Sequence, residues 1–195
     1  MKNRIFMGIF LLFVCSFSHA KGTMDLRGVV YDVGLKFTPE SCSVDTFDID
    51  LVKYDISVIA NILRANAIRI EGEDIGRLIA AAEVAHAAGL KIFFNPWKMN
   101  VGEEEVVAYM AQAAQAAEKL REKGADLVFV AGCEYSMFND GVFKGNSITE
   151  RLGTLMSFGQ MESKEAALKA VQEKAEVLNR ILADICRAVR ANYKG

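Results

Sequence analysis

The sequence predicts an α/β fold built from four strand-helix units with parallel strands. Short runs rich in β-branched and aromatic residues alternate along the chain with longer segments of helical periodicity. Repeated succession of strand, helix and strand predicts parallel strands joined by right-handed crossovers, with helices covering the sheet. At 195 residues, of which 52% are hydrophobic, the chain is long enough for one domain with a packed core.

The first 20 residues have the pattern of a secretory signal peptide. Lys2 and Arg4 precede an apolar run over residues 5–17, and small residues follow at the usual cleavage positions. This run is shorter than the roughly 20 residues that a helix needs to cross a bilayer, so we expect cleavage and no stable membrane anchor. Export predicts a periplasmic or secreted protein, whereas translation from Met24 would give a cytoplasmic one.

Residues 21–195 form the expected mature domain, a partial (β/α) barrel, and carry a modest negative charge. Without the two basic residues of the signal peptide, 23 − 2 = 21 basic residues face 25 acidic ones, a net charge of −4. This balance does not favour nucleic acid or an acidic membrane as a partner. One histidine, His86, and no C-x-x-C spacing remain, so we expect no metal and no cofactor. A disulfide between Cys42 and Cys133 stays open under the export hypothesis.

Four strands are expected, each a short run of β-branched or aromatic residues. They cover residues 27–34, 66–72, 91–97 and 126–134. The last contains LVFVA, which does not alternate polar and apolar residues. Such a run is typical of a parallel strand that is covered on both faces.

Three helices are expected between these strands. The first, about residues 48–65, opens with acidic capping residues and has apolar residues along one side. The second, about residues 73–88, ends before Gly89. The third begins with glutamates at 103–105 and ends with basic residues before Gly124, so its charges complement the helix dipole at both ends.

The last helix, about residues 163–193, carries an apolar seam about three heptads long. Its residues step by three and four and are Leu168, Val171, Ala175, Leu178, Leu182, Ile185 and Val189. The seam favours either a coiled-coil partner, as in a homo-oligomer, or burial against the sheet. Because a closed barrel of eight units takes about 250 residues, we expect about half a barrel here.

Polar residues cluster at the carboxyl ends of the expected strands, where ligands bind in parallel α/β folds. We expect substrate-binding roles for Asp32, Arg69, Glu71, Asn95, Trp97 and Tyr135. Several of these residues could instead have a purely structural role. Asp32 would cap a turn, Arg69 would pair with a neighbouring carboxylate, and Trp97 would pack in the core or a loop.

Glu134 is the strongest candidate for a catalytic residue. It follows the apolar run of the fourth expected strand. A carboxylic acid held near apolar groups resists ionisation, as a general acid that protonates a glycosidic oxygen must. The alternative is a structural ion pair with Arg69.

These residues resemble the first half of a glycoside-hydrolase-type (β/α)8 barrel. The matching segments are NAIRI, a strand ending in Asn95-Pro96-Trp97, and then VAGCEY, where such barrels place the acid/base glutamate. More narrowly, RGVVYDVG, FDIDLVKYDISVIANILRANAIRIEGED and GADLVFVAGCEYSMFNDG are similar to a bacterial family labelled abortive phage infection proteins. The resemblance runs from about Leu26 to Gly195.

The resemblance implies a domain that acts on or binds carbohydrate, with Glu134 as the acid/base, Arg69 at the second strand's end and Trp97 as a substrate contact. Two departures limit it. Cys133 stands where many such hydrolases have an asparagine that contacts the sugar. The retaining mechanism also needs a second carboxylate about 5 to 5.5 Å from the first, and in those enzymes it comes from the seventh strand.

Asp32, Glu71 or Asp140 could replace that carboxylate, but nothing in the sequence fixes their distances from Glu134. The loop over residues 135–162 contains large apolar residues, among them Met137, Phe138, Phe143, Phe158 and Met161, and is expected to act as a lid or to cover apolar surface. Three functions therefore stay open. They are a hydrolase-like domain completed by another half-barrel, a non-catalytic half-barrel that binds or self-associates, and a truncated remnant of a phage-defence-type protein.

Overall fold

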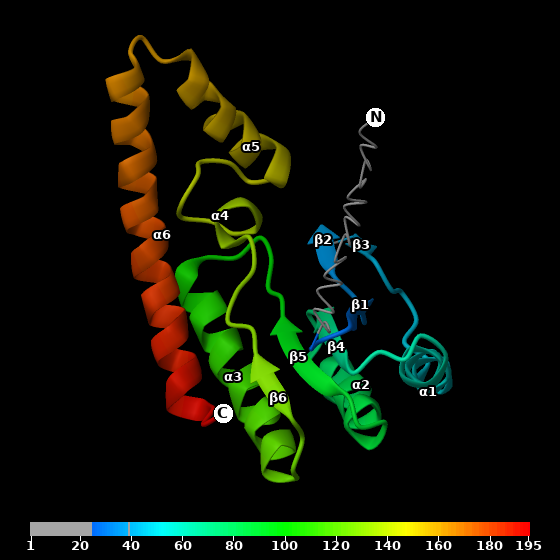
Figure 1. The fold of residues 1–195 in the computed structure, drawn as a ribbon. Coiled ribbons are helices and arrows are strands. Elements are labelled where there is room, and N and C mark those ends of the chain that lie inside the picture. Colours follow the sequence, from blue (N-terminus) through cyan, green and yellow to red (C-terminus); the bar gives the residue numbers. More distant parts are fainter. Residues whose placement is uncertain (1–24, 39) are drawn as a thin grey trace, which may run out of the picture.

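The computed structural model describes residues 25–38 and 40–195, in which four parallel strands form one sheet in the order β1-β4-β5-β6. Their bounds are Gly28–Asp32 for β1, Ala67–Gly72 for β4, Lys91–Pro96 for β5 and Leu127–Phe129 for β6. The strands lie side by side in the order in which they occur along the chain (Figure 1). The predicted α/β class with parallel strands is confirmed, whereas the predicted signal peptide lies outside the described residues.

The fourth strand is shorter than predicted. β6 ends at Phe129, five residues before Glu134, although the Val130 N–H still donates to the carbonyl oxygen of Phe94 at 2.8 Å. Gly132 then adopts a φ of 122°, which L side chains rarely adopt. The prediction of an extended run through residue 134 was wrong because the chain turns at this glycine. The structure also contains a short antiparallel hairpin of β2 (Lys36–Thr38) and β3 (Ser41–Cys42) that was not predicted.

The four predicted helices are present. They are α1 (Ile49–Ser57), which continues as the π-helical turn Val58–Ile62, α2 (Ile75–Ala87), α3 (Glu103–Glu122) and α6 (Lys164–Asn192). Asp48, Asp74 and Ser163 cap α1, α2 and α6, because each side chain accepts hydrogen bonds from backbone N–H groups of the first turn. None of the described helices combines the length and the apolar character that crossing a bilayer requires.

The helices pack on one side of the sheet. Alternation along β4 and β5 directs Ile68, Ile70, Ile92 and Phe94 toward them, and none of these four side chains is exposed to solvent. Small side chains on the facing helices allow close approach to the sheet, namely Ala81, Ala82 and Ala85 in α2 and Ala113, Ala114 and Ala117 in α3. This layer contains most of the hydrophobic core.

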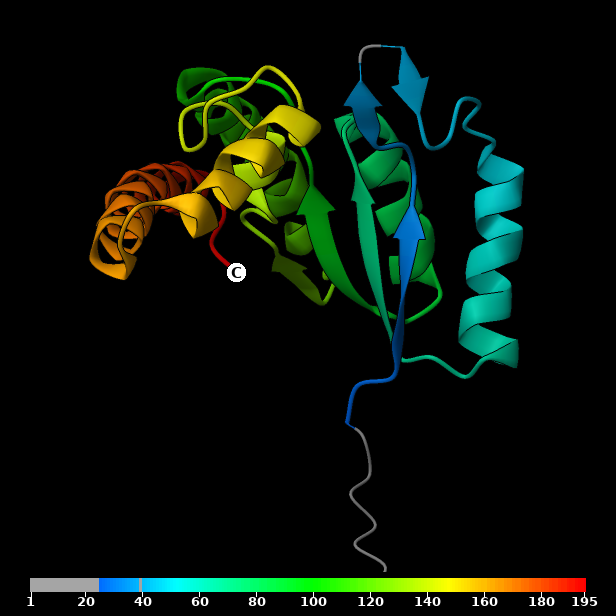
Figure 2. The ribbon, with the colours of Figure 1, turned by 90° about the horizontal axis from the view of Figure 1, so that it is seen from above.

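The other side of the sheet is called the open face here. Strand register places Val30, Arg69, Phe93 and Val128 in one row across it. Val30 is 57% exposed and Val128 is 38% exposed, so the described residues leave both ends of this row accessible. The view from above shows the helices ranged around the opposite side of the sheet (Figure 2).

Helix α6 uses its apolar seam in two ways. Its carboxyl-terminal half buries Ile181, Ile185 and Val189 in the core and lies along α3 (Figure 1). One predicted alternative was burial against the sheet, whereas the main partner of this helix is another helix. Its amino-terminal half extends beyond the sheet, and Leu168 and Val171 are exposed there. The seam is therefore only partly explained by packing within the described chain.

The segment between β6 and α6 contains α4 (Tyr135–Phe138), α5 (Ile148–Ser157) and the short 3-10 helix Phe158–Gln160. It lies near the carboxyl ends of β5 and β6 (Figure 1). Val142 is buried in the main core, and Phe143 packs against that core from a partly buried position. The segment thus covers apolar surface, as one of its two predicted roles requires.

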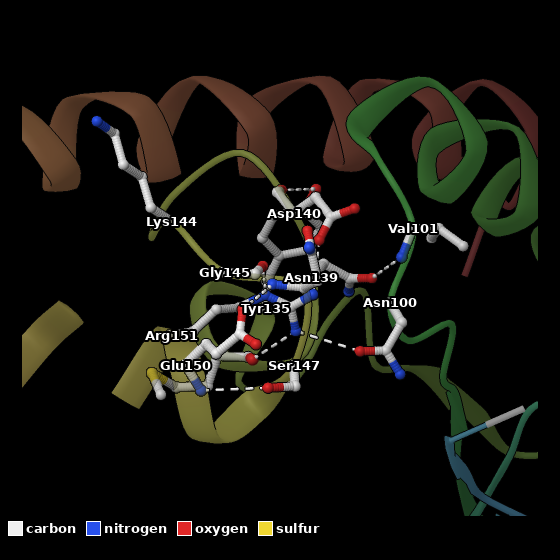
Figure 3. Close-up of polar contacts among 12 residues, drawn as sticks. Asn100, Val101, Tyr135, Asn139, Asp140, Lys144, Gly145, Ser147, Glu150 and Arg151 are labelled. Atoms are coloured by element: carbon white, nitrogen blue, oxygen red, sulfur yellow. Dashed lines mark hydrogen bonds and ion pairs between the residues drawn. The ribbon is translucent and has the colours of Figure 1, made fainter. Parts of the chain in front are cut away.

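A buried arginine holds this segment in place. Arg151 has no solvent exposure, and its guanidinium donates hydrogen bonds to four different residues (Figure 3). The acceptors are Asp140 Oδ1 at 2.6 Å, Asn100 Oδ1 at 3.2 Å, and the carbonyl oxygens of Met137 at 3.1 Å and Gly145 at 3.2 Å. Because Asn100 follows β5 and the other acceptors follow β6, this arginine joins two loops above the sheet.

We expect Arg151→Ala to lower the free energy of unfolding by about 3 kcal/mol, because it leaves a carboxylate and several polar acceptors without their donor. Urea denaturation measures this change. Arg187→Ala is the matched control, because its ion pair with Asp184 at 2.6 Å lies on the surface and should contribute less than about 1 kcal/mol. Equal losses in the two variants would contradict the role given to Arg151.

Candidate ligand-binding site

Polar side chains from three adjacent strands meet at the carboxyl end of the open face. The register pairs Asp32 with Glu71 and Glu71 with Asn95, one pleat beyond the row that contains Arg69. Four of the residues predicted to bind substrate therefore lie on one side of the sheet and at one end of it. We call Asp32, Arg69, Glu71 and Asn95 the polar rim.

Arg69 and Glu71 form an ion pair within the polar rim. Arg69 Nη2 lies 2.9 Å from Glu71 Oε2, and both side chains are largely buried. The same nitrogen lies 3.5 Å from the sulfur of Cys133, a contact that the sequence did not predict. Arg69 thus pairs with a neighbouring carboxylate, as its structural alternative proposed, and this partner is Glu71 and not Glu134. A partly buried pair fixes the orientation of both groups more surely than it stabilises the fold.

Unpaired buried polar atoms concentrate at this end of the sheet. In the described part of the chain, the buried side-chain nitrogen and oxygen atoms without a hydrogen-bond partner are Arg69 Nε, both amide atoms of Asn95, and Trp97 Nε1. Asn95 has no solvent exposure. Leaving a buried donor or acceptor unpaired costs about 1–3 kcal/mol, so native proteins rarely leave several together without a functional reason.

Trp97 does not form the exposed stacking platform that was one of its predicted roles. It is only 8% exposed and packs edge-on against Phe138, with a ring-centroid distance of 5.3 Å and an interplanar angle of 88°. Leu35 and Met99 complete a small apolar cluster with it, and Cys133 lies against this cluster. The indole therefore serves as packing beside the polar rim, as its structural alternative proposed.

Asp32 has the turn-capping role that was its structural alternative. Its Oδ1 atom accepts a hydrogen bond from the Gly34 N–H at 2.7 Å. Gly34 has a φ of 129°, a conformation suited to glycine, so the chain can turn sharply after β1. The carboxylate of Asp32 nevertheless remains partly exposed at the edge of the polar rim.

Tyr135 lies apart from the polar rim, in α4, and is only 4% exposed. Its hydroxyl donates to the carbonyl oxygen of Asp140 at 3.4 Å (Figure 3). Burial raises the pKa of Tyr135 to about 12, and the nearby carboxylates of Glu103 and Asp140 act in the same direction. The prediction that Tyr135 binds substrate assumed a strand through residue 134. The earlier end of β6 instead places this tyrosine in the main core.

Glu134 lies on the surface just before α4. Its backbone has φ 47° and ψ 31°, a left-handed conformation that is uncommon for a residue with a side chain. Its carbonyl oxygen accepts hydrogen bonds from the N–H groups of Met137 and Phe138. The apolar surroundings on which the acid hypothesis depends are therefore absent, because the side chain is exposed to water.

No family model matches this chain, and no curated protein matches it either. The resemblance to glycoside hydrolases and to abortive phage infection proteins rests on the quoted segments alone. Cys42, Cys133 and Cys186 are free thiols, so the open alternative of a disulfide between Cys42 and Cys133 is not realised in the structure. Within residues 25–38 and 40–195, no group of three or more His, Cys, Asp or Glu side chains could hold a metal ion.

We expect Asn95→Leu to raise the free energy of unfolding by about 1–2 kcal/mol, because it removes two unpaired buried atoms at similar volume. The matched control is Asn139→Leu. Asn139 is also buried, but it donates to the carbonyl oxygen of Lys98 at 2.8 Å and accepts from the Val101 N–H at 3.3 Å. That change should lower stability by a similar amount. A loss in both variants would mean that Asn95 has partners in the native protein.

We expect Glu134→Gly to stabilise the protein by about 1 kcal/mol, because glycine adopts a left-handed conformation without steric penalty. Glu134→Gln keeps the side chain and removes only its charge, so its melting temperature should stay close to that of the parent. Calorimetry distinguishes the two variants. A destabilised Glu134→Gly would show that the glutamate side chain makes stabilising contacts.

Proposed function

We propose that this chain is a half-barrel of glycoside-hydrolase-like design that binds carbohydrate through the polar rim. One observation carries the proposal. Polar side chains from three strands lie at one end of the open face, together with four buried polar atoms that have no hydrogen-bond partner. In the absence of a match to known families, the proposal rests on this geometry and on the sequence resemblance.

The strand order supports the barrel part of the proposal. In doubly wound folds the strand order reverses and helices cover both faces. Here the strands follow one another in chain order, and the helices pack on one side. Right-handed crossovers that always step in the same direction produce this arrangement, which is also that of a (β/α) barrel.

The chemistry of the polar rim supports a hydroxyl-rich ligand. Carboxylates accept hydrogen bonds, a guanidinium donates them, and an amide does both, so the rim can satisfy the alternating donors and acceptors of a sugar. Arg69 also brings a positive charge that Glu71 balances at 2.9 Å. This near-neutral pairing favours a neutral polar ligand over a strongly charged one.

Binding is better supported than hydrolysis. The hydrolytic version of the proposal assigns Glu134 as general acid, but this side chain is exposed and does not belong to the polar rim. A retaining mechanism would also require a second carboxylate about 5 to 5.5 Å away. We therefore propose carbohydrate binding as the primary function and treat turnover as an outcome of the test.

The test uses the fluorescence of Trp97, the only tryptophan of the chain, which packs beside the polar rim. We expect titration with a panel of monosaccharides and oligosaccharides to shift its emission with a saturable curve. Glu71→Gln removes one charge from the rim and should weaken binding at least tenfold, which corresponds to about 1.4 kcal/mol. Glu83→Gln is the matched control, because that glutamate pairs with Lys123 on the outer surface at 2.9 Å and should leave binding unchanged.

Circular dichroism of each variant confirms that it is folded before titration. Absence of a saturable response to every sugar, or equal affinity in the parent and Glu71→Gln, would overturn the proposal. Aryl glycosides test the hydrolytic version in the same assay. If they are turned over, Glu134→Gln should abolish the activity, and an unchanged rate would remove Glu134 from the mechanism.

A further inference from the structure

A groove runs beside the free edge of β6. Its volume is about 270 Å³, and its walls come from the strand and from the last turns of α6, including Leu127, Val128, Phe129, Val189, Arg190 and Tyr193. β6 pairs with β5 along one edge, and within the described residues no strand pairs with its other edge. An apolar groove beside an unpaired strand edge has the shape and the hydrogen-bonding groups to receive another strand.

Tyr193 defines where such a strand would begin to pair. Its hydroxyl donates to the carbonyl oxygen of Leu127. Because the preceding carbonyl, of Asp126, accepts from the N–H of Ile92 in β5, the Leu127 carbonyl points to the free edge. That acceptor is occupied, so an added strand would pair with β6 mainly through the outward N–H and carbonyl groups of Phe129, its last residue.

The opposite end of the sheet has the complementary feature. β1 pairs with β4 along one edge, and the described residues provide no strand for its other edge. Large apolar side chains are exposed in β1 and in the helix that follows it along the chain. They are Val30 in β1 and Leu51, Tyr54, Ile62 and Leu63 in and after α1. A free strand edge and exposed large apolar side chains are both features of surfaces that bind another chain.

We propose that a second copy of this chain covers both ends, with β1 of each copy in the groove beside β6 of the other. Four parallel strands per copy give eight in the pair, the number at which a barrel closes around an interior filled by side chains. A twofold axis along the barrel makes the two junctions identical and keeps all strands parallel, so the assembly is closed. The row of Val30, Arg69, Phe93 and Val128 becomes part of the interior of this barrel.

A second copy fits the two ends better than an unrelated chain. At one end of the sheet, β1 is a strand of five residues with an unpaired edge. At the other end, β6 has an unpaired edge beside a groove. A second copy related by a twofold axis covers both of these edges at the same time. In this assembly two polar rims face each other at the carboxyl end of the barrel. Formation of the assembly does not depend on the proposed ligand.

Sedimentation velocity tests the inference, with protein expressed from the full sequence so that any signal peptide is removed by the cell. We expect a mass of two chains, each no larger than 21.5 kDa. Val128→Glu and Val30→Glu place a charge at the two ends of the row and should each weaken self-association at least a hundredfold. Met156→Glu is the matched control, because Met156 is an exposed apolar residue in α5, away from both strand edges, and should leave the mass unchanged.

Hydrogen exchange of the parent protein provides a measurement that does not depend on variants. The outward amides of β1 and the amide of Phe129 should be protected at high protein concentration and exchange faster on dilution. A single-chain mass at every concentration, larger open-ended assemblies, or a different protein found by mass spectrometry in the purified particle would each overturn the inference. So would a two-chain mass that both glutamate variants retain in folded form.

Discussion

Burial of one side of a parallel sheet determines the rest of this structure. Ile68, Ile70, Ile92 and Phe94 lose all contact with water beneath alanine-rich helices, and a residue of this size contributes about 1.5–3 kcal/mol when it is fully buried. Because strand side chains alternate with a period of two, this burial also fixes the positions of their neighbours. Arg69, Glu71 and Asn95 must then point to the opposite side. The polar rim is therefore a geometric result of hydrophobic packing on the other face.

The carboxyl ends of the strands are organised by two further clusters. The apolar cluster of Leu35, Trp97 and Met99 packs beside the polar rim, and Arg151 ties the loops after β5 and β6 together above it. The guanidinium of Arg151 is stabilised by neutral carbonyl and amide oxygens as well as by one carboxylate, which compensates for its complete loss of hydration. Rigid loops around the rim can hold its unpaired donors and acceptors in one arrangement.

Most of the fold could be predicted from the sequence because local signals determine it. Helical periodicity, acidic capping residues and glycine stops located α1, α2, α3 and α6, and β-branched runs located the strands. The site was predicted less well, because Gly132 and Glu134 adopt left-handed conformations that composition does not reveal. That turn moved Tyr135 into the core and exposed Glu134. Arg151 gave no signal, since a lone arginine in a segment predicted as a loop usually remains in water.

The order of the strands has a consequence for how the chain folds. Each parallel pairing joins residues that are near in sequence: Gly28 meets Ala67 after 67 − 28 = 39 residues, Ala67 meets Lys91 after 24, and Ile92 meets Leu127 after 35. Each pairing therefore requires closure of only one strand-helix unit, and the entropic cost of closure grows slowly with loop length. Each unit can dock on its predecessor as soon as it leaves the ribosome. The strand order thus allows the sheet to be extended one strand at a time, in the direction of synthesis.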